Sequence, residues 1–144
     1  MSSGTILLVE DNPDDEMLAL RALKKTETLN TVVVTRDGEE ALEYVFGTGK
    51  FKNRDPSETP QVIFLDIKLP KLNGLEVLRN IREDQRTSLI PIVLLTSSDE
   101  ERDMIDGYKL GANSFINKPV DFDQFTDQVK VLGRYWLGIN KTPQ

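Results

Sequence analysis

The chain has 144 residues, 38% of them hydrophobic and 29% charged, and its formal net charge is −6. This length and composition fit one soluble globular domain and argue against a disordered chain. The negative charge gives no general attraction to nucleic acid or to anionic membranes. No apolar run approaches the ~20 residues of a membrane-spanning helix. The first residues, MSSGTILLVED, do not resemble a signal peptide, so we expect a cytoplasmic protein.

Two residue types are absent from the sequence, and their absence restricts the possible chemistry. Without Cys there is no disulfide framework, no zinc–thiolate site and no thiol nucleophile. Without His there is no Ser-His-Asp triad, no imidazole metal ligand and no phosphohistidine. Any chemistry therefore has to use carboxylates, hydroxyls and lysines.

Five short apolar runs predict β-strands, and each is followed by a segment with helical spacing. The run VIFL at residues 62–65 has no polar face, which is typical of a strand buried on both sides. Strands that alternate with helices form a parallel sheet with helices on both faces. The predicted strands are residues 6–9, 32–34, 62–65, 92–95 and 114–117.

Capping residues mark the predicted helix boundaries. Asn12 and Pro13 begin the first helix, as an N-cap followed by the residue favoured at the first helical position. The pair at 37–38, Asp-Gly, turns the chain into the second helix. The segment Ser-Ser-Asp at 97–99 supplies candidate caps for the fourth helix, and Gly111 is its expected stop signal.

Apolar stripes define the faces of the last two helices. The fourth helix is expected to be amphipathic through Met104, Ile105 and Tyr108. The fifth helix has a long stripe that we interpret as core packing. A second stripe, Val131 and Tyr135, is expected to leave apolar surface for a partner. The long stripe consists of Phe122, Phe125, Val129, Leu132 and Trp136.

Residues 47–60, GTGKFKNRDPSETP, have no periodicity and predict a long loop. The sequence leaves two interpretations of this loop open, a tolerated surface insertion and a partner-binding loop. No internal repeat or linker indicates a second domain. Residues 1–144 are therefore expected to form a single domain.

Polar residues follow four of the predicted strands. These residues are Glu10 and Asp11, Asp66, Thr96, and Lys118. Because the carboxyl ends of parallel strands meet at one edge, where open α/β sheets bind ligands, we expect these side chains to cluster. Crowded carboxylates need a proton or a cation, and a half-open site with oxygen ligands favours Mg²⁺.

The same cluster has the components of a site for a phosphoryl group. A divalent metal, an ammonium group and a hydroxyl would surround a carboxylate. Asp66 is the candidate nucleophile, as carboxylates are in aspartyl-phosphate enzymes. Lys118 supplies the ammonium and Thr96 the hydroxyl.

Four segments of the chain resemble the receiver domain of two-component response regulators in order and spacing. The segments are ILLVEDNPDD, VIFLDIKLPKLNG, PIVLLTSSDE and GANSFINKPV. The resemblance covers about residues 5–137. It implies a flavodoxin-like α/β fold, a doubly wound sheet of five parallel strands in the order 2-1-3-4-5. It also implies a signalling protein rather than an enzyme, with a sensor histidine kinase as its partner.

The resemblance assigns roles to individual residues. It implies that Asp66 accepts the phosphoryl group from a kinase phosphohistidine. Asp11 and Asp66 are expected to bind Mg²⁺ directly, together with the backbone carbonyl of Lys68. Glu10 is expected to act on the metal through water.

Thr96 and Phe115 resemble the switch pair of the family. On phosphorylation Thr96 is expected to move toward the phosphoryl group and the Phe115 ring to move inward. This change would remodel the surface formed by the fourth helix, the fifth strand and the fifth helix. The resemblance also implies that Lys118 contacts the phosphoryl oxygens and that its bond to Pro119 is cis.

The loop at 47–60 and the ending RYWLGIN are similar to single-domain regulators that pair with phytochrome-type kinases and often form homodimers. The apolar residues near Val131, Tyr135 and Trp136 fit a homodimer, and no output domain is expected. Two alternatives stay open: a phosphorylation-independent interaction scaffold and a Mg²⁺-dependent aspartyl-phosphate phosphohydrolase. Position 68 is Lys instead of the second acid that such a hydrolase normally uses, and the retained acids and Lys118 argue against the scaffold.

Overall fold

The computed structural model describes residues 4–24, 31–97 and 100–141. Within these residues a single five-stranded parallel sheet forms the centre of the molecule. The strands are β1 (Thr5–Val9), β2 (Thr31–Thr35), β3 (Val62–Leu65), β4 (Ile92–Thr96) and β5 (Ser114–Asn117). Their order is β2-β1-β3-β4-β5, and every neighbouring pair is parallel. This order confirms the predicted flavodoxin-like topology.

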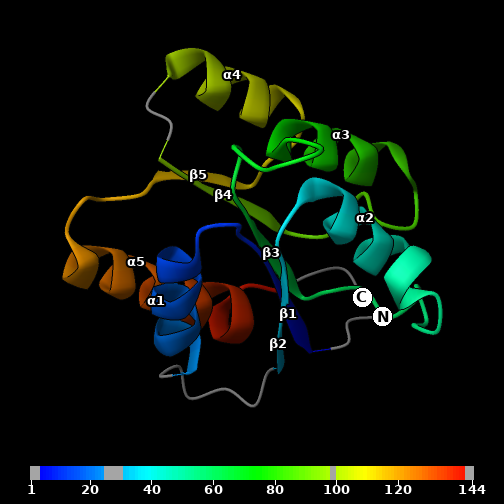
Figure 1. Ribbon diagram of the computed structural model, residues 1–144, viewed down its shortest axis with the longest axis horizontal. Helices are drawn as coiled ribbons and strands as arrows, with labels where there is room; N and C mark the ends of the chain where they lie inside the picture. Colours follow the sequence, from blue (N-terminus) through cyan, green and yellow to red (C-terminus); the bar gives the residue numbers. More distant parts are fainter. Residues whose placement is uncertain (1–3, 25–30, 98–99, 142–144) are drawn as a thin grey trace.

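Helices cover both faces of the sheet (Figure 1). The helices are α1 (Pro13–Lys24), α2 (Gly38–Phe46), α3 (Gly74–Glu83), α4 (Glu101–Lys109) and α5 (Phe122–Arg134), with a 3₁₀ turn at Gly49–Phe51 and a π-helical turn at Tyr135–Ile139. Helices α1 and α5 lie on one face, and α2, α3 and α4 lie on the other. In the described part of the chain, every helix is too short or too polar to cross a bilayer.

The alternation of side chains along β3 divides the core into two layers. Val62 and Phe64 point into the layer under α1 and α5, whereas Ile63 and Leu65 point into the layer under α2 and α3. All four side chains are completely buried. The run has no polar face because it is buried on both sides, as the sequence predicted.

The predicted cap Asn12 is present as hydrogen bonds, and Asp37 of the predicted turn also caps its helix. The Oδ1 atom of Asn12 accepts from the backbone N–H groups of Asp14, at 2.9 Å, and Asp15, at 3.1 Å. Asp37 accepts from the N–H of Glu40 at 2.7 Å. These bonds satisfy N–H groups that have no partner within their own helix, and so they fix where α1 and α2 begin.

The predictions for α4 were partly wrong. The N-cap residue is Glu100, whose side chain makes no capping bond, and Ser97 is exposed one residue beyond β4. Residues 98–99 of the expected cap lie outside the described residues. The expected stop signal is confirmed, because Gly111 follows the helix with a positive φ of 101°.

The apolar stripe of α4 faces solvent instead of the core. Met104, Ile105 and Tyr108 are all exposed. The helix contacts the sheet through Gly107, where a Cβ atom would lie 2.6 Å from Cδ1 of Leu94. Helical spacing reveals that a stripe exists, but it does not say whether the stripe packs against the sheet or stays on the surface.

The long stripe of α5 is confirmed as core packing at four of its five positions. Phe125, Val129 and Trp136 are buried, and Leu132 packs against the same layer. Phe122 is instead 64% exposed, because it is the first residue of α5 and lies before the helix packs against the sheet. The buried position of Trp136 also removes it from the surface that we expected to be available for a homodimer.

The loop at 47–60 packs back onto α2. The ring of Phe51 meets the ring of Tyr44 edge-on, with the centroids 5.1 Å apart. The guanidinium of Arg54 lies 4.2 Å from the centroid of the Tyr44 ring and donates to the Tyr44 carbonyl at 2.8 Å. The predicted long loop is therefore present, and Tyr44 gives it a defined conformation.

Candidate functional site

The register of the sheet brings the predicted site residues together. Val9 pairs with Leu65 across β1 and β3, so the chain leaves these neighbouring strands at Glu10 and Asp66. Thr96 pairs with Asn117 across β4 and β5, which places Lys118 directly beyond the same edge. The predicted clustering at the carboxyl edge is therefore present.

Three carboxylates form the acidic part of the site. Glu10, Asp11 and Asp66 each offer an oxygen, and these oxygens all lie within 4.8 Å of one another. Glu10 is 3% exposed and Asp66 is 6% exposed, whereas Asp11 faces solvent. A group of hard oxygen ligands with one open side fits a divalent cation that keeps several waters.

Lys118 connects this acidic group to helix α1. Its Nζ atom donates to Glu10 at 2.5 Å, to Asp15 at 2.9 Å and to Asp66 at 3.1 Å. The three bonds use all three donors of an ammonium group. The lysine side chain is only 8% exposed, so its charge depends on these partners.

Asp15 is the member of this cluster that sequence reasoning missed. An acid in the first turn of a helix also favours the positive helix end, so its position in the sequence alone does not assign Asp15 to the site. A further signal was available, because Asp15 lies three residues after the cap Asn12 and therefore in the first turn of the helix that begins at this edge. That spacing keeps a carboxylate close to the edge where β1 ends.

Burial and charge shift the protonation of two groups. Burial raises the pKa of Glu10 to about 7, against the opposing hydrogen bond and charge of Lys118. Burial lowers the pKa of Lys118, but the charge of Asp66 and the bonds to Glu10 and Asp15 outweigh it and raise the pKa above its ordinary value. Lys118 is therefore an ammonium at neutral pH, and Glu10 takes up a proton more readily than a solvated glutamate does.

The loop after β3 holds Asp66 in place. The N–H of Asp66 donates to the Val9 carbonyl at 3.1 Å, and the N–H of Lys68 donates to Oδ1 of Asp66 at 3.3 Å. Gly74 lies against this turn, where a Cβ atom would come within 2.1 Å of the Asp66 carbonyl oxygen. Glycine is needed at that position because the loop folds so closely over the end of the strand.

The expected switch residues lie on adjacent strands. Thr96 ends β4, is completely buried, and accepts at its carbonyl from the N–H of Lys118 at 2.7 Å. Phe115 on β5 is partly buried and packs against the core layer under α2 and α3. Gly107 of α4 leaves space beside it, since a Cβ atom there would lie 3.6 Å from Cδ2 of Phe115.

One expectation about this edge was wrong. The described residues contain no cis peptide bond, so Lys118 and Pro119 are joined by a trans bond. The trans form is the intrinsically favoured one before proline, by about 0.5–1 kcal/mol. Lys118 reaches all three of its carboxylate partners from this arrangement.

The match to known proteins is consistent with this geometry. Residues 6–130 match the response regulator receiver domain. The chain belongs to the response regulator receiver domain family. Receiver domains are signalling proteins that take a phosphoryl group from a histidine kinase, which agrees with the acidic pocket and the buried lysine.

Solved structures of this receiver family are close to the chain over its whole length. The response regulator Rcp1 of Synechocystis is 34% identical over 132 residues, which cover 92% of this chain and 88% of Rcp1. Its Mn²⁺-bound structure superposes with a TM-score of 0.91 at 32% identity, covering 97% of this chain and 99% of Rcp1. The phosphorylated cyanobacterial phytochrome response regulator RcpA gives a TM-score of 0.91 at 36% identity, and the match covers 97% of this chain and 98% of RcpA. The bacteriophytochrome response regulator AtBRR is 47% identical, with a TM-score of 0.75 and coverage of 97% and 96%.

These similarities confirm the resemblance that the four sequence segments indicated. The chain is a receiver domain of the two-component type, and its similar proteins include phytochrome response regulators. The Mn²⁺ in Rcp1 together with the three carboxylates here indicates a divalent metal site.

Proposed function

We propose that Asp66 accepts a phosphoryl group from the phosphohistidine of a sensor histidine kinase. The observation that carries the proposal is the place of Asp66 at the end of β3, beside two other carboxylates and 3.1 Å from Nζ of Lys118. In the reaction an Asp66 oxygen forms a bond to phosphorus while the bond between phosphorus and the histidine nitrogen breaks. The imidazole of the kinase leaves as the electron pair returns to its nitrogen.

The proposed metal of this reaction is Mg²⁺. The residues that would hold it are Asp11 and Asp66 with the backbone carbonyl of Lys68, and Glu10 through water. The hard oxygen donors and the open side at Asp11 fit this ion. When bound, Mg²⁺ offsets the negative charge that gathers on the phosphoryl oxygens. The Mn²⁺ ion in Rcp1 supports a divalent cation in this family.

Three other residues would respond to the phosphoryl group. We assign Lys118 to contact its oxygens, because the ammonium already lies beside Asp66 and is held charged. Thr96 would donate its hydroxyl from the end of β4. The ring of Phe115 would then move inward, coupled to Thr96, and change the packing of the α4-β5-α5 surface.

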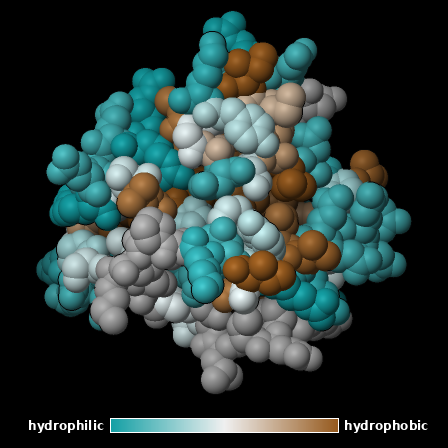
Figure 2. Space-filling model, turned by 180° about the vertical axis from the view of Figure 1, so that it is seen from behind, coloured by the Kyte–Doolittle hydropathy of each residue, from teal (hydrophilic) through white to brown (hydrophobic). Residues whose placement is uncertain are grey.

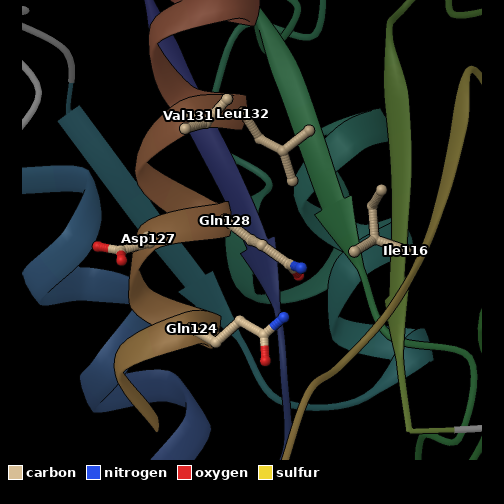
Figure 3. Close-up of a pocket in the computed structure, with 6 residues that line it drawn as sticks. All are labelled: Ile116, Gln124, Asp127, Gln128, Val131 and Leu132. Atoms are coloured by element: carbon tan, nitrogen blue, oxygen red, sulfur yellow. The ribbon is translucent and has the colours of Figure 1, made fainter. Parts of the chain in front are cut away.

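The α4-β5-α5 surface has a groove that fits a role in output. A cavity of about 450 Å³ lies between α5 and β5, with Ile116 on one side and Leu132 on the other (Figure 3). Gln128 points into it from α5, and its Oε1 atom is buried with no hydrogen-bond partner in the described part of the chain. Phe115 precedes Ile116 on β5 but faces the opposite side of the sheet, so a change at Phe115 would reach this groove through the backbone of β5.

We also propose the setting in which this receiver domain works. Residues 1–144 would act as one receiver domain with its core at about 5–137, in the cytoplasm, where its kinase uses ATP. A phytochrome-type kinase is the proposed donor, because the chain is similar to RcpA and AtBRR. The only reactions it would catalyse are its own phosphorylation and dephosphorylation.

A homodimer is part of the same proposal. Val131, Tyr135 and Ile139 are exposed at intervals of four residues along α5 and the π-helical turn. On the face seen in Figure 2, hydrophobic side chains form several brown areas separated by hydrophilic residues. We assign the Val131–Tyr135–Ile139 row to contact with a second copy of the chain.

Intact mass spectrometry tests the central assignment. The protein is incubated with acetyl phosphate with and without Mg²⁺, and Asp66→Asn and Asp14→Asn are treated in parallel. The expected result is one phosphoryl group on the wild type and on Asp14→Asn, only with Mg²⁺, and none on Asp66→Asn. Equal labelling of Asp66→Asn would overturn the assignment. Labelling of no variant, even with a histidine kinase as donor, would favour the phosphorylation-independent scaffold.

A further inference from the structure

Asp15 contacts the lysine of the site without belonging to the metal group. Its Oδ2 atom lies 2.9 Å from Nζ of Lys118, and the side chains of Asp15 and Lys118 are 24% and 8% exposed. Across the described residues, the carboxylates whose oxygens lie within 4.8 Å of one another are Glu10, Asp11 and Asp66, and Asp15 is not among them. Lys118 therefore has two kinds of partner. Glu10 and Asp66 are candidate metal ligands, and Asp15 lies outside that group.

We propose that Asp15 is a positioning residue that holds the Lys118 ammonium while Glu10 and Asp66 turn from the lysine to a metal ion. This inference rests on the proposed metal and phosphoryl role of the site. It adds a residue that contacts neither the metal nor the phosphoryl group, and that acts only through Lys118.

The first step of the argument is competition for the carboxylates. In the structure Lys118 bonds to both Glu10 and Asp66. A cation that draws on these two carboxylates weakens both bonds to the lysine. A buried ammonium that loses its partners is strongly unfavourable, so this loss opposes metal binding.

The second step is the partner that stays. Because Asp15 lies outside the metal group, its bond to Lys118 survives when the other two weaken. The ammonium then keeps one carboxylate partner and has donors free for phosphoryl oxygens. Asp15 therefore lowers the cost of metal binding and keeps Nζ beside Asp66.

The third step is a comparison with a neighbouring acid. Asp14 is in the same turn of α1, carries the same charge, and is exposed. Neutralising either residue removes one negative charge from the neighbourhood of the site. Only the change at Asp15 also removes a charged partner of Lys118, so the difference between the two variants isolates that contact.

The experiment measures Mg²⁺ affinity by isothermal titration calorimetry for the wild type, Asp15→Asn and Asp14→Asn. Asp15→Asn is expected to weaken binding about fivefold or more, and Asp14→Asn by less than about twofold. The same pair is then measured in a Lys118→Met background, where no ammonium needs holding. There the two substitutions are expected to have equal effects. Circular dichroism verifies that each variant is folded before titration.

Each outcome decides a different point. Equal losses in Asp15→Asn and Asp14→Asn would overturn the positioning role of Asp15. A loss in Asp15→Asn that persists undiminished in Lys118→Met would also overturn it, because the effect would not pass through the lysine. If the wild type itself binds no Mg²⁺, the proposed metal site is wrong and the inference is wrong with it.

Discussion

Nζ of Lys118 lies 3.1 Å from Oδ2 of Asp66, across 52 residues of chain. The two side chains are 8% and 7% exposed, so neither charge is solvated by bulk water. Each charge therefore depends on the other for its stabilisation. The side chains at this edge of the sheet form a charged cluster, and a cation or a phosphoryl group would change the net charge of that cluster.

Removing the lysine charge should destabilise the metal-free protein. Lys118→Met leaves Glu10, Asp15 and Asp66 without their shared cation, and we expect a loss of about 2 kcal/mol in the free energy of unfolding. The loss is limited because Glu10 can take up a proton near neutral pH. Urea unfolding in EDTA measures it. Lys71→Met, which removes an exposed lysine, is the control and should change the value by less than about 0.5 kcal/mol. Equal stability of Lys118→Met and wild type would contradict this account.

The raised pKa of Glu10 predicts a pH dependence of stability. A group whose pKa is higher in the folded state than in the unfolded state favours folding while it is protonated. The stability that Glu10 contributes is thus present at low pH and is lost as the pH rises through about 7. In EDTA, the free energy of unfolding should fall by about 1 kcal/mol between pH ~6 and ~8. Glu10→Gln should remove this slope. An unchanged slope in that variant would assign the effect to another group.

Much of the fold follows from local patterns in the sequence. Each strand is a short apolar run, and the caps at Asn12 and Asp37 act within a few residues of themselves. The strand order is not local, but a parallel sheet with right-handed crossovers permits few arrangements. The main site was predictable for a related reason, because Glu10, Asp66 and Lys118 each directly follow a strand.

The features that the sequence did not reveal depend on distant contacts. Asp15 meets Lys118 across 103 residues, and only the relative positions of α1 and β5 determine that meeting. The exposure of Met104 on α4 depends on Gly107 taking the place against the sheet. The exposure of Phe122 depends on where α5 begins relative to the sheet. Periodicity gives the pattern of a helix but not its distance from the neighbouring layer.

The close packing at Gly107 predicts an effect of a single methyl group. A Cβ atom there would lie 2.6 Å from Cδ1 of Leu94, which is completely buried and has little room to move. Gly107→Ala should therefore destabilise the protein by about 1–3 kcal/mol in urea unfolding. Gly138→Ala is the matched control, because nothing lies within 4 Å of its Cβ position. Because Ala favours the helix more than Gly does, a Gly107→Ala variant as stable as the wild type, or more stable, would contradict the packing account.

The conformation of the 47–60 loop should depend on Arg54. Its guanidinium contacts the ring and the carbonyl of Tyr44, so Arg54→Met removes both interactions. Hydrogen exchange across residues 47–60 should become several-fold faster, with little change in the sheet. Lys52→Met, in the same loop but exposed, is the control. Unchanged exchange in Arg54→Met would mean that the other contacts of the loop, among them Phe51 against Tyr44 and Lys50 with Glu40, are sufficient to hold it.

The exposed row on α5 predicts how the proposed homodimer can be disrupted. Val131 is 63% exposed and has Tyr135 one turn later, so Val131→Asp would bury a charge in a contact between two copies. Light scattering after size exclusion should show a dimer for the wild type at high concentration and a dissociation constant raised about tenfold or more in the variant. Val120→Asp, at a position 98% exposed outside the helices, adds the same charge away from the row. It should leave the dimer unchanged, since a general increase in negative charge is screened over the distances between exposed groups. Equal weakening by both variants, or a wild type that stays monomeric with and without phosphorylation, would assign the row to another role.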